Sequence, residues 1–166
     1  MKNNLLFDFK VNKENKTVTV NREFAAPLAK VWAAWTQAEL LEQWWAPKPW
    51  KAVTMSMDFR EGGAWLYYMQ GPAGERHYSR ADYNKINKQK DLSWLDAFCD
   101  EQGKINEDFP RSQWNNTFRS ENGNTIVSII ITHKSVAGME KLLEMGFQGG
   151  FTMGLENLDQ LLQKDF

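Results

Sequence analysis

Alternating apolar and polar residues predict seven β-strands along this chain. The clearest alternation runs from Lys16 to Phe24, where Val18 and Val20 alternate with threonine and asparagine. A period of two with β-branched residues is typical of a strand that has one buried face. The six other predicted strands span residues 52–59, 64–70, 77–87, 91–99, 113–119 and 125–133. Turns rich in glycine or asparagine separate several of them, which favours antiparallel hairpins.

Apolar residues at helical spacing predict helices in two parts of the chain. Residues 27–36 form a short amphipathic pattern, and a second helix follows to about residue 45, with Thr36 as its expected cap. Pro47 and Pro49 prevent that helix from continuing. After Ser135 one apolar stripe continues almost to the C-terminus, which predicts a single long helix. The stripe consists of Met139, Leu142, Leu143, Phe147, Phe151, Leu155, Leu158 and Leu162.

The order of these elements predicts an α+β fold. We expect a curved antiparallel sheet of about six or seven strands, wrapped around the long C-terminal helix, with two short helices after the first strand. Residues 1–15 are expected to be an N-terminal extension, and residues 16–166 a single domain.

Composition and charge narrow the classes of function. The net charge is -1, and no basic patch stands out, so nucleic acid is not an expected partner. A single cysteine, Cys99, excludes an internal disulfide and suits a reducing compartment. No apolar run approaches the ~18 residues of a membrane span, and the N-terminal one is too short for a signal peptide. We therefore expect a cytoplasmic monomer or homodimer.

Aromatic residues are unusually frequent. The chain has eight tryptophans, and the segment LEQWWAPKPW at residues 41–50 holds three of them beside two prolines. Each buried tryptophan removes roughly 150–250 Å² from water, so the cluster either completes a large core or lines a pocket. The sequence leaves both alternatives open.

Three glycines interrupt the predicted C-terminal helix. Gly146, Gly150 and Gly154 are spaced four residues apart and would lie on one helix face, where each costs about 1 kcal/mol relative to alanine. Either the helix backbone approaches the sheet closely there, or the missing side chains leave a void beneath the helix.

Eight short motifs resemble the family of homologues of the heat-shock-protein-90 ATPase activator, in the START-like (SRPBCC) superfamily. They are AP at 26–27, VWAAWT at 31–36, WWAP at 44–47, FREGGAW at 59–65, MQGPAG at 69–74, DAFCDEQG at 96–103, LEMGF at 143–147 and LENLDQLL at 155–162. The resemblance covers about residues 16–164. It implies the helix-grip fold, with a deep apolar cavity between the sheet and the terminal helix, and places the WWAP corner at the cavity mouth.

Residue parity on the strands, combined with this resemblance, predicts which side chains face the cavity. The predicted ligand-binding residues are Trp45, Trp65, Tyr67, Met69, Trp94, Asp96, Phe98, Trp114, Asn116, Phe147, Gly150 and Phe151. Aromatic rings beside a few polar groups are typical of a pocket for a small apolar or aromatic molecule. An oversized hydrophobic core would give the same pattern.

Catalytic motifs are absent from the sequence, and only isolated candidates remain. Asp96, His133 and Tyr67 are weak candidates for an acid or base in the cavity. His77 and His133 lie on different predicted strands, without further ligands at metal-binding spacing, so we expect neither a metal nor a cofactor. Binding of a small apolar or aromatic ligand is the leading functional prediction. The alternatives are a cyclase-like or hydrolase-like enzyme and a protein-interaction module like the family's namesake activators.

Overall fold

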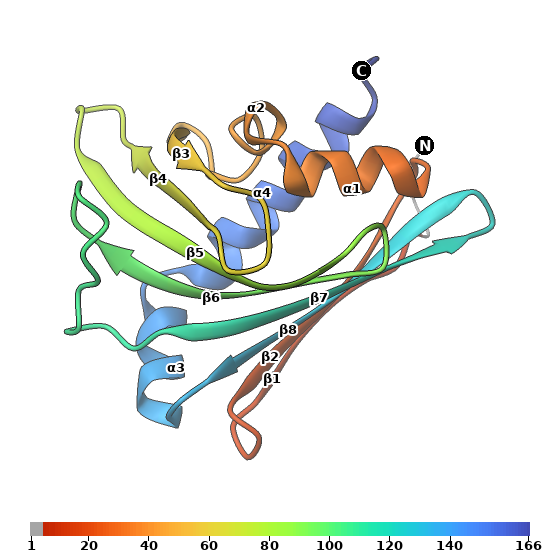
Figure 1. Cartoon of the computed structure of the whole chain (residues 1–166). Coiled ribbons are helices and arrows are strands. Elements are labelled where there is room, and N and C mark those ends of the chain that lie inside the picture. Colours follow the sequence, from red (N-terminus) through yellow and green to blue (C-terminus); the bar gives the residue numbers. More distant parts are fainter. Residues whose placement is uncertain (1–4) are drawn as a thin grey trace.

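The computed structural model describes residues 5–166, and within them eight strands form one antiparallel sheet (Figure 1). The order across the sheet is β1-β2-β8-β7-β6-β5-β4-β3. The strands are β1 (Phe7–Asn12), β2 (Thr17–Phe24), β3 (Lys51–Met57), β4 (Ala64–Gln70), β5 (Arg76–Asn87), β6 (Asp91–Cys99), β7 (Ser112–Glu121) and β8 (Asn124–His133). Hairpins join the strands from β3 to β8, whereas β2 crosses over to pair with β8.

Four helices accompany the sheet: α1 (Leu28–Thr36), α2 (Ala38–Leu41), α3 (Val136–Glu144) and α4 (Phe147–Leu162). Figure 1 shows the sheet bending around α4, with α1 and α2 on the same side and α3 near one end. The α+β class and the curved antiparallel sheet that we predicted are therefore confirmed.

The strand count was too low, because the chain begins its sheet earlier than expected. Residues 7–12, which we assigned to an N-terminal extension, form β1 and pair in register with β2. The two short helices therefore follow the second strand. The alternation in FDFKVN is real but short, and Phe7 and Val11 are exposed while Phe9 packs against the core. Phe7, Phe9 and Val11 share one face, but an alternation of only six residues gives little sequence signal.

The predicted single C-terminal helix is also corrected, because it divides at Gly146. This residue has a φ of 93°, in the left-handed region, and its N–H donates to the carbonyl of Leu143 at 3.0 Å. Glycine enters that region without a steric penalty and commonly ends helices. The apolar stripe continues across the break, so its period alone could not reveal two helices.

The second short helix ends earlier than predicted. Helix α2 closes at Leu41, and residues 42–50 form a loop that carries three tryptophans. Thr36 does not cap it, because the Thr36 hydroxyl donates back to the carbonyl of Trp32 at 2.8 Å. Both prolines lie in this loop, which we call the tryptophan loop.

The tryptophan loop packs directly on α4. A β-carbon built on Gly154 would stand 3.2 Å from the carbonyl oxygen of Trp44, and the Asn157 amide donates to the carbonyl of Ala46 at 3.2 Å. Close backbone approach, one of the two alternatives left open by the sequence, therefore explains Gly154, although the partner is this loop and not the sheet. At Gly150 the nearest atom to such a β-carbon is Pro47 Cγ at 3.7 Å, an ordinary contact.

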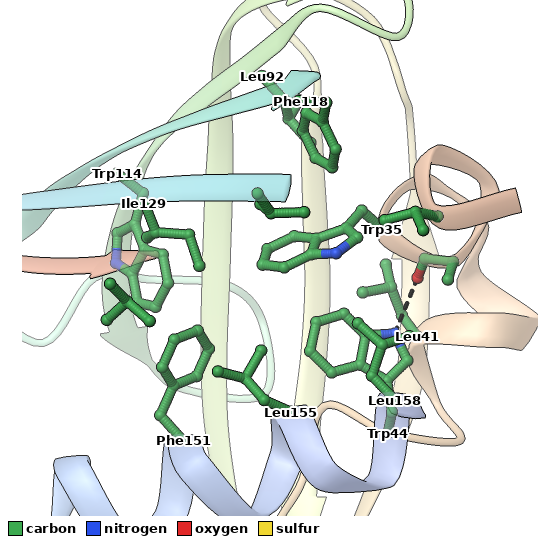
Figure 2. Packing of buried hydrophobic residues seen from close by; sticks show 14 of the residues in the cluster. Trp35, Leu41, Trp44, Leu92, Trp114, Phe118, Ile129, Phe151, Leu155 and Leu158 are labelled. Carbon is green, nitrogen blue, oxygen red and sulfur yellow. Dashed lines mark hydrogen bonds between the residues drawn. The ribbon is translucent and has the colours of Figure 1, made fainter. Parts of the chain in front are cut away.

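Figure 2 shows the core between α4 and the sheet. Trp44 lies between α1 and α4, and its indole N–H donates to the carbonyl of Ala34 at 2.9 Å. Its ring centroid is 4.9 Å from that of Trp35, which in turn meets Phe118 edge-on. Trp44 is thus a buried core residue that completes the packing of the short helices.

Candidate functional site

A pocket of about 270 Å³ lies between the sheet and the two C-terminal helices. Strands β4 to β8 contribute one wall, α3 and α4 another, and Trp45 and Pro47 of the tryptophan loop also line it. The pocket thus occupies the curve of the sheet beside the core drawn in Figure 2.

Eleven of the twelve side chains or glycines predicted to bind a ligand line this pocket. They are Trp45, Trp65, Tyr67, Met69, Trp94, Asp96, Phe98, Trp114, Phe147, Gly150 and Phe151. The exception is Asn116, which is buried outside the lining and donates to the carbonyl of Leu92 at 2.9 Å. It shares a strand with Trp114 but lies nearer to the packed core around Phe118.

Trp45 lies at the centre of the aromatic wall of the pocket. Its ring centroid is 5.7 Å from that of Trp114, 6.0 Å from that of Trp65 and 6.1 Å from that of Trp94. Its indole N–H donates to the hydroxyl of Tyr67 at 3.0 Å. Each ring packs against other rings, and edge-to-face contacts are prominent among them. The shape of the wall is therefore set by the protein itself.

Three polar residues meet at the pocket on neighbouring strands. The backbone N–H of Ser112 and the indole N–H of Trp114 donate to the two oxygens of Asp96, at 2.7 and 2.9 Å. The Ser112 hydroxyl lies 3.1 Å from Nδ1 of His133, its direct partner across β7 and β8. We call Asp96, Ser112 and His133 the polar cluster, and all three line the pocket.

Burial sets the protonation states of the site. Desolvation raises the pKa of Asp96, against hydrogen bonds from Ser112 and Trp114 that lower it. Desolvation also raises the pKa of the Tyr67 hydroxyl and lowers the pKa of His133. Tyr67 and His133 are therefore neutral at neutral pH and can act there as hydrogen-bonding groups.

The lowered pKa of His133 predicts a pH-dependent stability. The ordinary histidine pKa is about 6.5, so below it the unfolded chain takes up a proton that the folded protein does not. Stability therefore falls as the pH drops through this window towards the folded pKa. We expect the wild type to lose more free energy of unfolding than His133→Gln between about pH 7 and about pH 5.5. Urea denaturation at both pH values measures this, and equal losses would contradict the prediction.

Neither a metal cluster nor a membrane helix is found in the described part of the chain. Among residues 5–166, no group of three or more histidine, cysteine, aspartate or glutamate side chains could hold a metal ion. No helix in the same range is long and apolar enough to cross a membrane.

The sheet curved around the C-terminal helices, together with the pocket between them, defines a START-like protein of the α+β class. The chain belongs to the AHSA1 family, described as "Activator of Hsp90 ATPase homolog 1-like protein", whose family model matches residues 25–163. This match confirms the resemblance seen in the sequence.

Solved structures share the fold over nearly the whole chain. Protein Ms6760 from Mycobacterium smegmatis is 30% identical, with a TM-score of 0.88 over 98% of this chain and 99% of that one. A protein from Arthrobacter aurescens is 28% identical, with a TM-score of 0.89 over 95% and 92% of the two chains. CalU16 from Micromonospora echinospora, at 18% identity and a TM-score of 0.63 over 95% and 84%, shares the fold alone. A search of curated proteins found no match.

Proposed function

We propose that this protein binds a small apolar or aromatic molecule in the pocket between the sheet and α4. The observation that carries the proposal is the ring of mutually packed aromatic side chains around about 270 Å³ of space. An apolar cavity of about 150 Å³ is enough to hold benzene. A molecule of one or two rings therefore suits the volume.

Two features favour a binding site over an oversized core. The pocket lining also includes the polar side chains of Tyr67, Asp96 and His133. Apolar pockets with a few such groups are typical ligand sites. The rings hold one another in place, so a ligand would meet a preformed surface. Little binding free energy would then be lost to ordering these side chains.

Gly150 and Gly149 provide a matched test of this proposal. Gly150 lines the pocket, whereas Gly149 does not, and a β-carbon on Gly149 meets nothing within 4 Å. Gly150→Leu places a side chain where the ligand would lie, and we expect at least a tenfold loss of affinity, which corresponds to about 1.4 kcal/mol. Gly149→Leu is expected to keep the wild-type affinity. Both changes favour the helix by up to about 1 kcal/mol.

The measurement is isothermal titration calorimetry with a panel of one-ring and two-ring aromatic compounds, supported by tryptophan fluorescence quenching. Saturable binding by wild type and Gly149→Leu, weakened in Gly150→Leu, supports the proposal. Absence of saturable binding across the panel, or equal binding by all three proteins, contradicts it.

The two alternatives predicted from the sequence each retain one supporting observation. The raised pKa of Asp96 in the pocket favours an acid or base role, and Asp96→Asn would then abolish turnover while the protein stays folded. The family description favours a chaperone-activator role, which a pull-down that recovers no Hsp90-type chaperone would contradict. A cytoplasmic location and a monomeric or homodimeric state remain predictions.

A further inference from the structure

His133 carries a polar atom that the protein itself leaves without a partner. Its side chain lines the pocket and is only 7% exposed, yet Nε2 has no hydrogen-bond partner among the described residues. The great majority of buried polar side-chain atoms in proteins have a partner, and leaving one without costs free energy. Such an atom in the wall of a pocket indicates where a ligand forms a hydrogen bond.

The polar cluster holds His133 in place and leaves Nε2 as the ring nitrogen without a hydrogen-bond partner. Ser112 is hydrogen-bonded to Nδ1, so the imidazole ring is oriented by its neighbour on β7. The two oxygens of Asp96 already accept hydrogen bonds from Ser112 and Trp114. Among the described residues of the cluster, Nε2 is therefore the buried side-chain atom without a partner, on a residue that lines the pocket.

We infer that the ligand carries a hydroxyl group on an aromatic or apolar body, and that this hydroxyl pairs with Nε2 of His133. The inference rests on the proposed binding function and specifies the class of ligand. A hydroxyl both donates and accepts a hydrogen bond, so it matches Nε2 in either tautomer of the neutral imidazole.

The charges around the pocket disfavour an anionic ligand. Asp96 is the acidic member of the polar cluster. The guanidinium of Arg80, which also lines the pocket, is already engaged by Asp82 and by the carbonyl of Gly103, both at 2.7 Å. A ligand carboxylate would therefore lie near the Asp96 carboxyl group, and the described residues that line the pocket offer no unengaged cation to balance it. A neutral hydroxyl avoids this repulsion.

Three probes that share one ring system test the inference: naphthalene, 2-naphthol and 2-naphthoic acid. We expect wild type to bind 2-naphthol about five- to tenfold more tightly than naphthalene, the size expected for one additional hydrogen bond. His133→Phe should remove this preference. His77→Phe applies the same substitution to the second histidine, which also lines the pocket but is exposed and packs against Trp50, and should keep the preference.

The outcomes separate this inference from the proposed function. If naphthalene binds wild type but 2-naphthol gains nothing, or if His133→Phe keeps the preference, the hydroxyl inference is wrong and the binding function stands. Tighter binding of 2-naphthoic acid than of 2-naphthol also overturns the inference. If none of the probes binds, both proposals fail.

A spectroscopic measurement avoids reliance on a core variant that could fail to fold. The chain has two histidines, so His77→Phe leaves His133 as its only imidazole. We expect 2-naphthol to shift the nitrogen-15 resonance of Nε2 in this variant and naphthalene to leave it unchanged. Equal responses to the two compounds would overturn the hydrogen bond that we infer.

Discussion

Replacing Asp159 with alanine is expected to lower the free energy of unfolding by about 3–5 kcal/mol, the usual cost of breaking a buried ion pair. Asp159 on α4 pairs with Arg22 on β2, and their side chains are only 9% and 10% exposed. The Arg22 guanidinium also lies over the rings of Phe7 and Phe24. In the Asp159→Ala variant, the charge of Arg22 would stay buried but would lose this carboxylate. Urea denaturation followed by tryptophan fluorescence measures the change.

Two controls separate the buried charge from other effects. Asp58 pairs with Arg60 on the surface, where the side chains are 56% and 70% exposed, so Asp58→Ala should cost less than about 1 kcal/mol. The double variant Arg22→Met/Asp159→Leu removes both charges and should recover most of the stability. A cost for Asp159→Ala as small as that of Asp58→Ala would show that the pair does not stabilise the docking of α4.

Replacing Trp44 with alanine should also cost about 3–5 kcal/mol, as is common for a buried tryptophan. Trp44 is among the largest fully buried side chains and packs on both Trp35 and Trp45. The change would leave a cavity beneath α1 and remove the donor to the carbonyl of Ala34. Thermal and urea denaturation, with circular dichroism as the second probe, measure the loss.

Trp50 in the same loop is the matched control for Trp44. It is half-buried, and its ring packs at a tilt against His77, with a centroid distance of 5.0 Å. Trp50→Ala should therefore cost clearly less than Trp44→Ala. If the two variants were equally stable, the different roles that we assign to these tryptophans would be wrong.

The sequence was a good guide to seven strands because their alternation is long and regular. Residues 64–70 and 91–99 were predicted with the bounds that β4 and β6 have. Strand β1 was missed because its alternation covers only six residues, at an edge of the sheet where Phe7 and Val11 are exposed. The helix break at Gly146 was missed because φ is a property of one backbone position, and an apolar stripe does not report it.

The candidate site followed from strand parity, since alternate residues of a strand face the same side. That rule brought Trp65, Tyr67 and Met69 to the pocket, and it also included Asn116, which lies too far along β7. Ser112 was missed because the strand was predicted to begin one residue later. Its pairing with His133 depends on the register between β7 and β8, which a single sequence does not display.

The tryptophan loop also answers why three indoles gather within ten residues. Trp44 completes the core, Trp45 forms the centre of the pocket wall, and Trp50 packs against the exposed His77. Both of the alternatives considered from the sequence are therefore realised, by adjacent residues. Pocket and core share one loop, so the shape of the pocket depends on the packing beneath it.

Gly146, in the left-handed region between α3 and α4, divides the helical wall of the pocket into two parts. Met139, Leu142 and Leu143 of α3 line the pocket beside the polar cluster, whereas Phe147 and Phe151 of α4 complete the aromatic wall. Under the binding function that we propose, substitutions on α3 would change one part of the pocket wall while Phe147 and Phe151 on α4 keep the other.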